Sequence, residues 1–317
     1  MENLNQTTIL KGYTPEEQLQ SIGEDIKDFS PINYCPNTMI SKDQKKLVVI
    51  ELNYDSEWEE NKKIEKVILL NSVTMIGRNI FRDFTSLQKV VIPNSVKQID
   101  SSAFKGCTSL EQIVIPDSVI EIGSNAFSGC TSLQEIVIPD SVTRILPLTF
   151  SNCTSLQKIV IPNSVKNIRE RAFENCTSLQ KIVIPNSVKE IDEAAFGGCT
   201  SLEEIVIPDS VTEIGRDAFN GCTSLEKIVI PESVTKIGYF AFENCKNLSL
   251  ITLPKVYSNI VEVLRGSSGD LVIKSVDNNY SYEDGLLIDK NNNTLIRCQS
   301  KSNKLEIPNS IKVIGDS

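Results

Sequence analysis

Residues 176–198 read CTSLQKIVIPNSVKEIDEAAFGG, and almost the same 23 residues begin again at Cys199. Aligned on this phrase, the chain contains eight full copies, which start at Asn61, Phe84, Cys107, Cys130, Cys153, Cys176, Cys199 and Cys222. A ninth copy begins at Cys245 and loses the pattern after Pro254. A fixed period of about 20 to 30 residues is typical of a solenoid, in which each coil buries its apolar side against its neighbours.

The spacing inside one copy predicts how a coil is built. The segment LEQIVIP at residues 110–116 predicts a short strand whose isoleucines point inward, while Gln112 and Val114 point outward. Its proline lacks a backbone N–H and ends the strand. The stretch from Val119 to Ile122 predicts a second short extended segment on the opposite side. The pair Ala126–Phe127 predicts a tight helical turn, where a small residue lets successive coils close.

The consensus C-T-S-L-x-x-I-V-I-P-x-S-V-x-x-I-G-x-x-A-F resembles the BspA-type (Treponema-type) leucine-rich repeat over residues 61–254. The segment LEIPNSIKVIGDS at residues 305–317 resembles the start of a further, truncated copy. This resemblance implies an α/β fold: a right-handed solenoid with a parallel concave β-sheet, and with second extended segments and helical turns elsewhere. It also implies a role in attachment and protein recognition, often on microbial surfaces.

Two segments outside the repeats predict additional structure. Residues 1–60 predict an N-terminal cap with a helix at about 15–29, begun by the capping box of Thr14, and a hairpin at about 38–52. Residues 255–304 predict an insertion that contains a second hairpin. Both hairpins place six polar, turn-forming residues between apolar ones, Ile40 with Leu47 and Ile288 with Leu295.

Three residue types recur in register and predict internal ladders. We expect one aromatic spine from Phe81, Phe104, Phe127, Phe150, Phe173, Phe196, Phe219 and Phe242. We expect hydroxyl groups that satisfy the backbone at Ser72, Ser95, Ser118, Ser141, Ser164, Ser187, Ser210 and Ser233. We expect buried free thiols, rather than disulfides or a metal site, at Cys107, Cys130, Cys153, Cys176, Cys199, Cys222 and Cys245.

Composition limits the chemistry of the 317-residue chain. There is no histidine, which removes Ser-His-Asp and Cys-His catalysis and the common zinc sites. The formal net charge of −9 argues against a nucleic-acid partner, because such a protein needs a basic surface. We therefore expect a non-enzymatic protein without a cofactor or metal.

The chain shows neither a secretory signal nor a run of 18 apolar residues. As written, it is expected to be a cytoplasmic monomer without membrane insertion. The sequence stops where the next Ala-Phe pair should follow, which suggests a piece of a longer repeat protein. In that case the family resemblance implies a secreted or cell-surface location.

The outward strand positions form two predicted stripes on the concave sheet. One stripe is mixed in charge and consists of Lys66, Lys89, Gln112, Glu135, Lys158, Lys181, Glu204 and Lys227. The other is apolar and consists of Ile68, Val91, Val114, Val137, Val160, Val183, Val206, Val229 and Thr252. Seven valines stacked one strand apart would make an apolar band about 30 Å long, and an exposed apolar band usually marks a contact. Valine is also a good strand residue, so the band could be only structural.

These stripes lead to the hypothesis of a recognition or adhesion module that binds a protein, such as a host or matrix protein, through the concave sheet. The candidate contact residues are Val114, Val137, Lys158, Val160, Lys181, Val183, Val206, Lys227 and Val229. A secondary patch is predicted where two copies break the pattern, at Leu146, Leu148, Tyr239 and Phe240. The alternative is a structural spacer or stalk, because a selective binding face usually differs from copy to copy.

Overall fold

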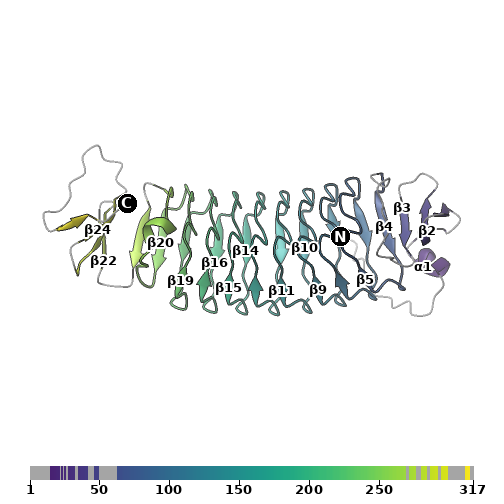
Figure 1. Cartoon of the computed structure of the whole chain (residues 1–317), viewed down its shortest axis with the longest axis horizontal. Helices are drawn as coiled ribbons and strands as arrows, with labels where there is room; N and C mark the ends of the chain where they lie inside the picture. The colour runs from purple at the N-terminus through teal and green to yellow at the C-terminus, as the bar shows by residue number, and fades with distance from the viewer. Residues whose placement is uncertain are drawn as a thin grey trace. The chain divides into compact units, whose positions relative to one another are not determined.

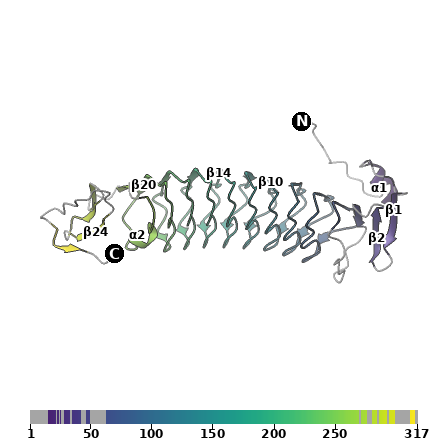
Figure 2. The same cartoon turned by 90° about the horizontal axis from the view of Figure 1, so that it is seen from above.

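The computed structural model describes residues 15–21, 23, 25, 28–32, 35–41, 46–49, 63–268, 271–275, 280–283, 286–291, 294–298 and 311–314. The chain divides into two compact units, Met1–Ser164 and Val165–Ser317, and each unit is described by itself. In both units the chain winds into stacked coils whose equivalent strands run parallel (Figures 1 and 2). This arrangement confirms the predicted parallel solenoid.

A single coil shows how the sequence produces the fold. In the coil that starts at Cys199, the first strand is β16 (Glu204–Val206), which alternates exposed, buried and exposed residues. Pro208 ends this strand, and its carbonyl accepts the N–H of Val211 at 3.0 Å to close a turn. The second strand, β17 (Glu213–Ile214), then runs along the other side of the coil. Each coil thus contributes a long strand to one sheet and a two-residue strand to another.

The first unit contains two such sheets. The long-strand sheet follows the order β1 (Phe29–Ile32), β2 (Cys35–Ser41), β3 (Lys46–Val49), β4 (Lys66–Leu69), β6 (Lys89–Val91), β8 (Gln112–Ile113), β10 (Glu135–Val137) and β12 (Lys158–Val160). The second sheet contains β5 (Met75–Ile76), β7 (Gln98–Ile99) and β9 (Glu121–Ile122). The equivalent strand of the next coil is β11 (Arg144–Ile145).

The N-terminal segment extends the long-strand sheet. Its hairpin is confirmed, because β2 and β3 pair antiparallel with Ile40 opposite Leu47. The helix is shorter than the expected 15–29: α1 spans Pro15–Ser21. It is followed by Gly23 in the left-handed conformation, with φ of 77°. Leu19 of α1 is fully buried, and the side chain of Gln18 accepts the backbone N–H of Asn71 at 3.0 Å. The helix therefore packs against the first coil.

The second unit has the same two kinds of strand. Its two-residue strands are β13 (Asn167–Ile168), β15 (Glu190–Ile191), β17 and β19 (Lys236–Ile237), which pair in that order. Its long strands form two groups: β14 (Lys181–Val183) pairs with β16, and β18 (Lys227–Val229) pairs with β20 (Leu250–Leu253) and then β21 (Val272–Ser275). No pairing joins β16 to β18 among the described strands.

The ninth copy does not end at Pro254, which corrects the expected boundary of the insertion at 255. β21 pairs parallel with β20, with Leu250 opposite Val272, so the chain completes another coil before it leaves the solenoid. This coil uses different residues for the same contacts. The Tyr257 hydroxyl donates to the Val234 carbonyl at 2.8 Å, as serine does elsewhere, and the short helix α2 (Ile260–Val263) replaces the usual turn.

A four-stranded sheet follows in the second unit. It has the order β22 (Tyr280–Glu283), β23 (Leu286–Asp289), β24 (Thr294–Cys298) and β25 (Val313–Ile314). The second predicted hairpin is confirmed, because β23 and β24 pair antiparallel with Ile288 opposite Leu295. β25, from the predicted truncated copy, pairs parallel with β24. The first residues of that copy lie outside the described residues.

The third side of each coil is a series of turns that are hydrogen-bonded to the next coil, instead of the expected helical turn. Ala194 and Gly198 adopt φ of 51° and 71°, a left-handed conformation that a right-handed helix excludes. The N–H groups of Ala194, Phe196 and Gly198 donate to the next coil, the middle one to the Ala218 carbonyl at 2.8 Å. On this side alternate N–H groups therefore bond to the next coil, while those between them bond within the turn, as from Gly197 to the Ala194 carbonyl at 3.0 Å.

Two of the predicted ladders hold the interior together. The spine phenylalanines are fully buried, and neighbouring rings within each unit stack with centroids 5.2–5.6 Å apart. The serine hydroxyls donate to a valine carbonyl 22 residues earlier, as expected. These pairs are Ser95 to Val73, Ser118 to Val96, Ser141 to Val119, Ser164 to Val142, Ser187 to Val165 and Ser210 to Val188.

Candidate functional site

The long strands place equivalent outward side chains directly beside one another. In the first unit, Glu135 lies opposite Lys158 and Val137 opposite Val160. In the second unit the register is the same, with Val183 opposite Val206 on β14 and β16. Because side chains alternate along a strand, the isoleucine between each charged residue and its valine points into the core. Parallel pairing without a register shift therefore turns the sequence repeat into a surface repeat.

We call the exposed valines of these strands the valine face: Val114, Val137 and Val160 in the first unit, and Val183, Val206 and Val229 in the second. Each exposes between 45% and 77% of its surface. A soluble protein seldom leaves branched apolar side chains this exposed in consecutive, aligned positions. The valine face is therefore the candidate contact surface, and it includes all six valines predicted from the sequence.

The apolar stripe is shorter at its N-terminal end than expected. Ile68 is 1% exposed, and Val91 is only half-buried, so neither belongs to the valine face. In β4, three consecutive residues starting at Val67 are buried, which means that the strand is covered on both faces. The N-terminal segment adds β3 beside β4 and packs α1 against the same coil. The outward side of β4 is therefore not open to a partner.

The charged stripe runs alongside the valines. Lys181 Nζ lies 2.9 Å from Glu204 Oε2, and Lys158 Nζ lies 3.8 Å from Glu135 Oε2. All four side chains are more than 60% exposed, so each ion pair contributes at most about 1 kcal/mol to stability. Lys227 is also exposed. These charges are thus accessible to a partner, and they are better suited to orienting it than to stabilising the fold.

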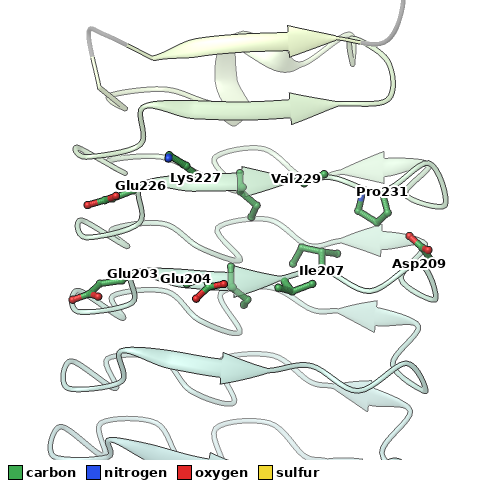
Figure 3. Close-up of a pocket in the computed structure, with 11 residues that line it drawn as sticks. Glu203, Glu204, Ile207, Asp209, Glu226, Lys227, Val229 and Pro231 are labelled. Atoms are coloured by element: carbon green, nitrogen blue, oxygen red, sulfur yellow. The ribbon is translucent and has the colours of Figure 1, made fainter.

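The face is hollowed between β16 and β18, where the sequence analysis expected an unbroken sheet. A groove of about 620 Å³ lies there, and Figure 3 shows the residues that line it. Glu203 and Glu226 lie at one end of the groove, and Asp209 and Pro231 lie at the other. Val206 and Val229 of the valine face also line it. Glu203 and Glu226 occupy equivalent positions of adjacent copies.

The residues of the predicted secondary patch belong to different units. Leu146 and Leu148 of the first unit are half-buried, and the buried Thr149 donates its hydroxyl to the Leu146 carbonyl at 2.7 Å. Local packing therefore accounts for this break in the pattern.

Tyr239 and Phe240 form a more accessible group in the second unit. Tyr239 is 55% exposed. The Phe240 ring lies 5.4 Å from the Arg216 guanidinium and 5.7 Å from that of Arg265, within the range of cation–π attraction. Phe240 is thus held by its own neighbours, which leaves Tyr239 as the more accessible aromatic group.

The cysteines of the ladder are buried thiols with low reactivity. All seven cysteines from Cys107 to Cys245 are buried and none is in a disulfide, as expected. The thiols donate to the carbonyl of the phenylalanine 26 residues earlier, for example Cys222 to Phe196 at 3.3 Å. Burial raises the pKa of the Cys107, Cys153, Cys199 and Cys245 thiols to about 12. Thiols that stay protonated make poor nucleophiles and poor metal ligands.

In the described part of the chain, no group of three or more His, Cys, Asp or Glu side chains is arranged to hold a metal ion. None of the helices in the described segments has the length and apolar character needed to cross a membrane.

Comparisons with known proteins agree with this architecture. The model of the BspA type leucine rich repeat region matches residues 54–180 and 166–264, in six copies. A leucine-rich repeat protein from Bacteroides ovatus is 24% identical with a TM-score of 0.65, over 91% of this chain and 76% of that one. A leucine rich cell surface protein from Faecalibacterium prausnitzii is 23% identical with a TM-score of 0.39, over 78% and 96%. A search of the curated proteins gave no match. Since the family model covers most of the solenoid, the chain belongs to the BspA-type leucine-rich repeat family.

Proposed function

We propose that this protein is a non-enzymatic recognition or adhesion module whose valine face binds another protein. The observation that carries the proposal is the exposure of six valines at equivalent positions of their copies, three in each unit, with Val137 opposite Val160 and Val183 opposite Val206. Core requirements do not explain them, because the isoleucine beside each valine already fills the interior. Leucine-rich repeat proteins generally mediate protein–protein interaction or adhesion, which supports the same reading.

The energetics of the face suit a protein partner. Burying one valine side chain contributes about 1.5–3 kcal/mol before the costs of association. In either unit three neighbouring valines could thus supply the apolar centre of an interface. Exposed lysines at its edge, Lys158 in the first unit and Lys181 and Lys227 in the second, would set the orientation of an acidic or polar rim. A secreted or cell-surface location is part of this proposal, because attachment to a host or matrix protein requires it.

A structural spacer or stalk is the second candidate. It is favoured by the near-identity of the coils, since Val137, Val160, Val183, Val206 and Val229 all follow the same Ile in the same strand. A stalk needs only uniform stacking, and valine fits a strand for that reason alone. The two candidates differ in whether the exposed valines are needed for any contact outside the chain.

Affinity capture distinguishes them. The whole chain and its double variant Val114→Glu with Val137→Glu are immobilised and exposed to host-cell lysate and matrix extract, and captured proteins are quantified by mass spectrometry. The recognition proposal expects proteins that the wild type retains and the variant loses at least tenfold. The fold should be unchanged, because neither valine enters the core.

The matched control changes two exposed residues at equivalent positions of the same coils on another side. Ile120→Glu with Thr143→Glu adds the same charge, and Ile120 is 61% exposed. This control should retain the captured proteins. If the valine variant and the control retain the same proteins equally, the valine face is not a binding surface and the spacer reading stands.

A further inference from the structure

The long-strand sheet of the second unit is open at one junction, between residues 203–210 and 226–233. We call this the open seam. β14 pairs with β16, and β18 pairs with β20, but β16 and β18 belong to different sheets. At the neighbouring junctions the residues just before the strands are joined by backbone hydrogen bonds. The N–H of Glu203 donates to the Gln180 carbonyl at 3.0 Å, and the N–H of Ser249 donates to the Glu226 carbonyl at 2.8 Å. The described hydrogen bonds include no equivalent bond from Glu226 to Glu203.

The serine ladder is interrupted at the same junction. Ser210 donates to Val188 at 2.7 Å, whereas the buried hydroxyl of Ser233 has no hydrogen-bond partner. In the repeat, the acceptor for Ser233 would be Val211, 22 residues earlier. Backbone and side-chain bonds are therefore lost together along one side of the coil.

Contacts beyond each end of the open seam are normal. The N–H of Ser224 donates to the Thr200 carbonyl at 3.2 Å, and that of Thr235 donates to the Thr212 carbonyl at 2.9 Å. The phenylalanine rings of the two coils stack as elsewhere. The two coils are thus properly stacked on their other sides, and the opening is confined to the strand face, where the groove lies.

Two carboxylates of like charge meet at the open seam. Glu203 and Glu226 hold the same position in adjacent coils, and both are exposed. The other adjacent pairs at this position within each unit carry a glutamine or a serine on at least one side: Glu65 and Gln88, Gln88 and Glu111, Glu111 and Gln134, Gln134 and Gln157, Gln180 and Glu203, Glu226 and Ser249. Like charges directly opposite each other across two strands are destabilising.

We propose that the open seam binds an arginine-bearing, extended segment of a protein partner. The groove is lined by four carboxylates, those of Glu203, Glu204, Asp209 and Glu226, and by the single ammonium group of Lys227. Its middle is apolar, with Val206 and Val229 at the surface and Ile207 beneath. An extended segment that alternates arginine with an apolar residue matches both features. This inference rests on the proposed function, because it specifies the chemistry of the partner on part of the valine face.

Arginine fits the groove better than lysine. Its planar guanidinium carries five N–H donors and can engage two carboxylates at once, which Glu203 and Glu226 present from neighbouring coils. The guanidinium would also remove the repulsion between these two carboxylates. Backbone groups of β16 and β18 that face the open seam are further hydrogen-bonding positions for an extended chain.

The test uses the whole chain and a fluorescent hexapeptide of alternating valine and arginine, capped at both ends, in fluorescence anisotropy at physiological salt. Two further peptides replace arginine with lysine or with neutral citrulline. We expect the arginine peptide to bind at least fivefold more tightly than the lysine peptide and at least tenfold more tightly than the citrulline peptide. Equal binding of the three peptides, or binding of none, overturns the proposal.

Matched variants separate the groove from the general acidity of the chain. Glu203→Gln with Glu226→Gln should weaken binding of the arginine peptide at least tenfold. Glu190→Gln with Glu213→Gln removes the same charge from equivalent positions on β15 and β17, and should change binding less than twofold. Equal weakening by both variants would show a nonspecific charge effect and overturn the proposal. Because Val114 and Val137 lie in the other unit, their variant tests the proposed function independently of this groove.

Discussion

The rings of Phe196 and Phe219 stack with centroids 5.4 Å apart and planes within 3° of each other, although 23 residues separate them in the chain. Both are fully buried. Because Phe196 also stacks on Phe173 at 5.3 Å, it is in ring contact with the coil on either side. The spine therefore couples each coil to its nearest neighbours.

Phe196→Ala should lower the free energy of unfolding by about 3–5 kcal/mol, through lost burial and the cavity that remains. Chemical denaturation measures the loss, and hydrogen exchange should show the adjacent coils loosened with it, since coupling in a solenoid is between neighbours. Tyr239→Ala is the control: Tyr239 is 55% exposed, and its truncation should cost less than about 1 kcal/mol. Equal losses for the two variants would contradict the assignment of the spine to the core.

The number of cysteines that react with a thiol reagent, out of nine in the chain, should differ sharply between the native and the denatured protein. Denatured protein should show nine thiols with a colorimetric reagent, and native protein at most two, Cys35 and Cys298, whose side chains lie outside the described residues. The seven ladder thiols are buried and cannot reach the reagent. A mass lower by two hydrogens per bridge would show that disulfides form and would contradict the free-thiol ladder.

Alkaline pH should destabilise the protein through the same thiols. In the unfolded chain a thiol ionises at its ordinary pKa of 9.0, whereas burial raises the pKa of Cys153 to about 12 in the folded state. The unfolded state therefore holds fewer protons above pH 9, and stability falls as the pH rises towards 12. Each such thiol can contribute up to about 1.4 kcal/mol per pH unit.

Cys153→Ala removes one of these contributions and should make the fall in stability between pH 9 and pH 11 less steep. Thermal denaturation at a series of pH values compares the variant with the wild type. Below pH 8 the difference in stability between the variant and the wild type should not change with pH. Parallel curves across the whole alkaline range would mean that the Cys153 thiol ionises equally in both states.

Removing either carboxylate at the open seam should stabilise the fold. Glu226→Gln recreates the pairing of a glutamate with a glutamine found at the junction of Gln180 and Glu203, and should raise the free energy of unfolding by about 0.2–1 kcal/mol. Glu203→Gln should do the same, and the double variant should gain little more, because each single change already removes the repulsion. Fully additive gains, or a loss in both single variants, would contradict repulsion as the cause of the opening.

Much of the fold could be predicted because the same contacts between coils recur in every copy of the repeat. The register of the phenylalanines and the outward valines follows from the period alone. The hairpins at Ile40–Leu47 and Ile288–Leu295 follow from polar turns between apolar residues. Such patterns depend on residues within a single coil or turn, so they can be recognised in the sequence alone.

The features that the sequence analysis missed depend on pairs of coils or on substitutions within one. The ninth coil lost its pattern because Tyr257 supplies the hydroxyl that serine provides elsewhere. Ile68 repeats the outward position, yet it is buried in the strand that pairs with the N-terminal β3. The open seam coincides with the pair Glu203 and Glu226, and neither residue departs from the consensus by itself.

Site-specific photocrosslinking tests the central claim, that the valine face contacts the partner, most directly. A benzophenone amino acid is placed at Val137 in one protein and at Thr143, on another side of the same coil, in a second protein. After irradiation with the captured proteins, the account predicts a crosslinked product from position 137 and none from position 143. A product from position 143 alone, or equal products from both, would contradict the assignment of the valine face as the contact surface.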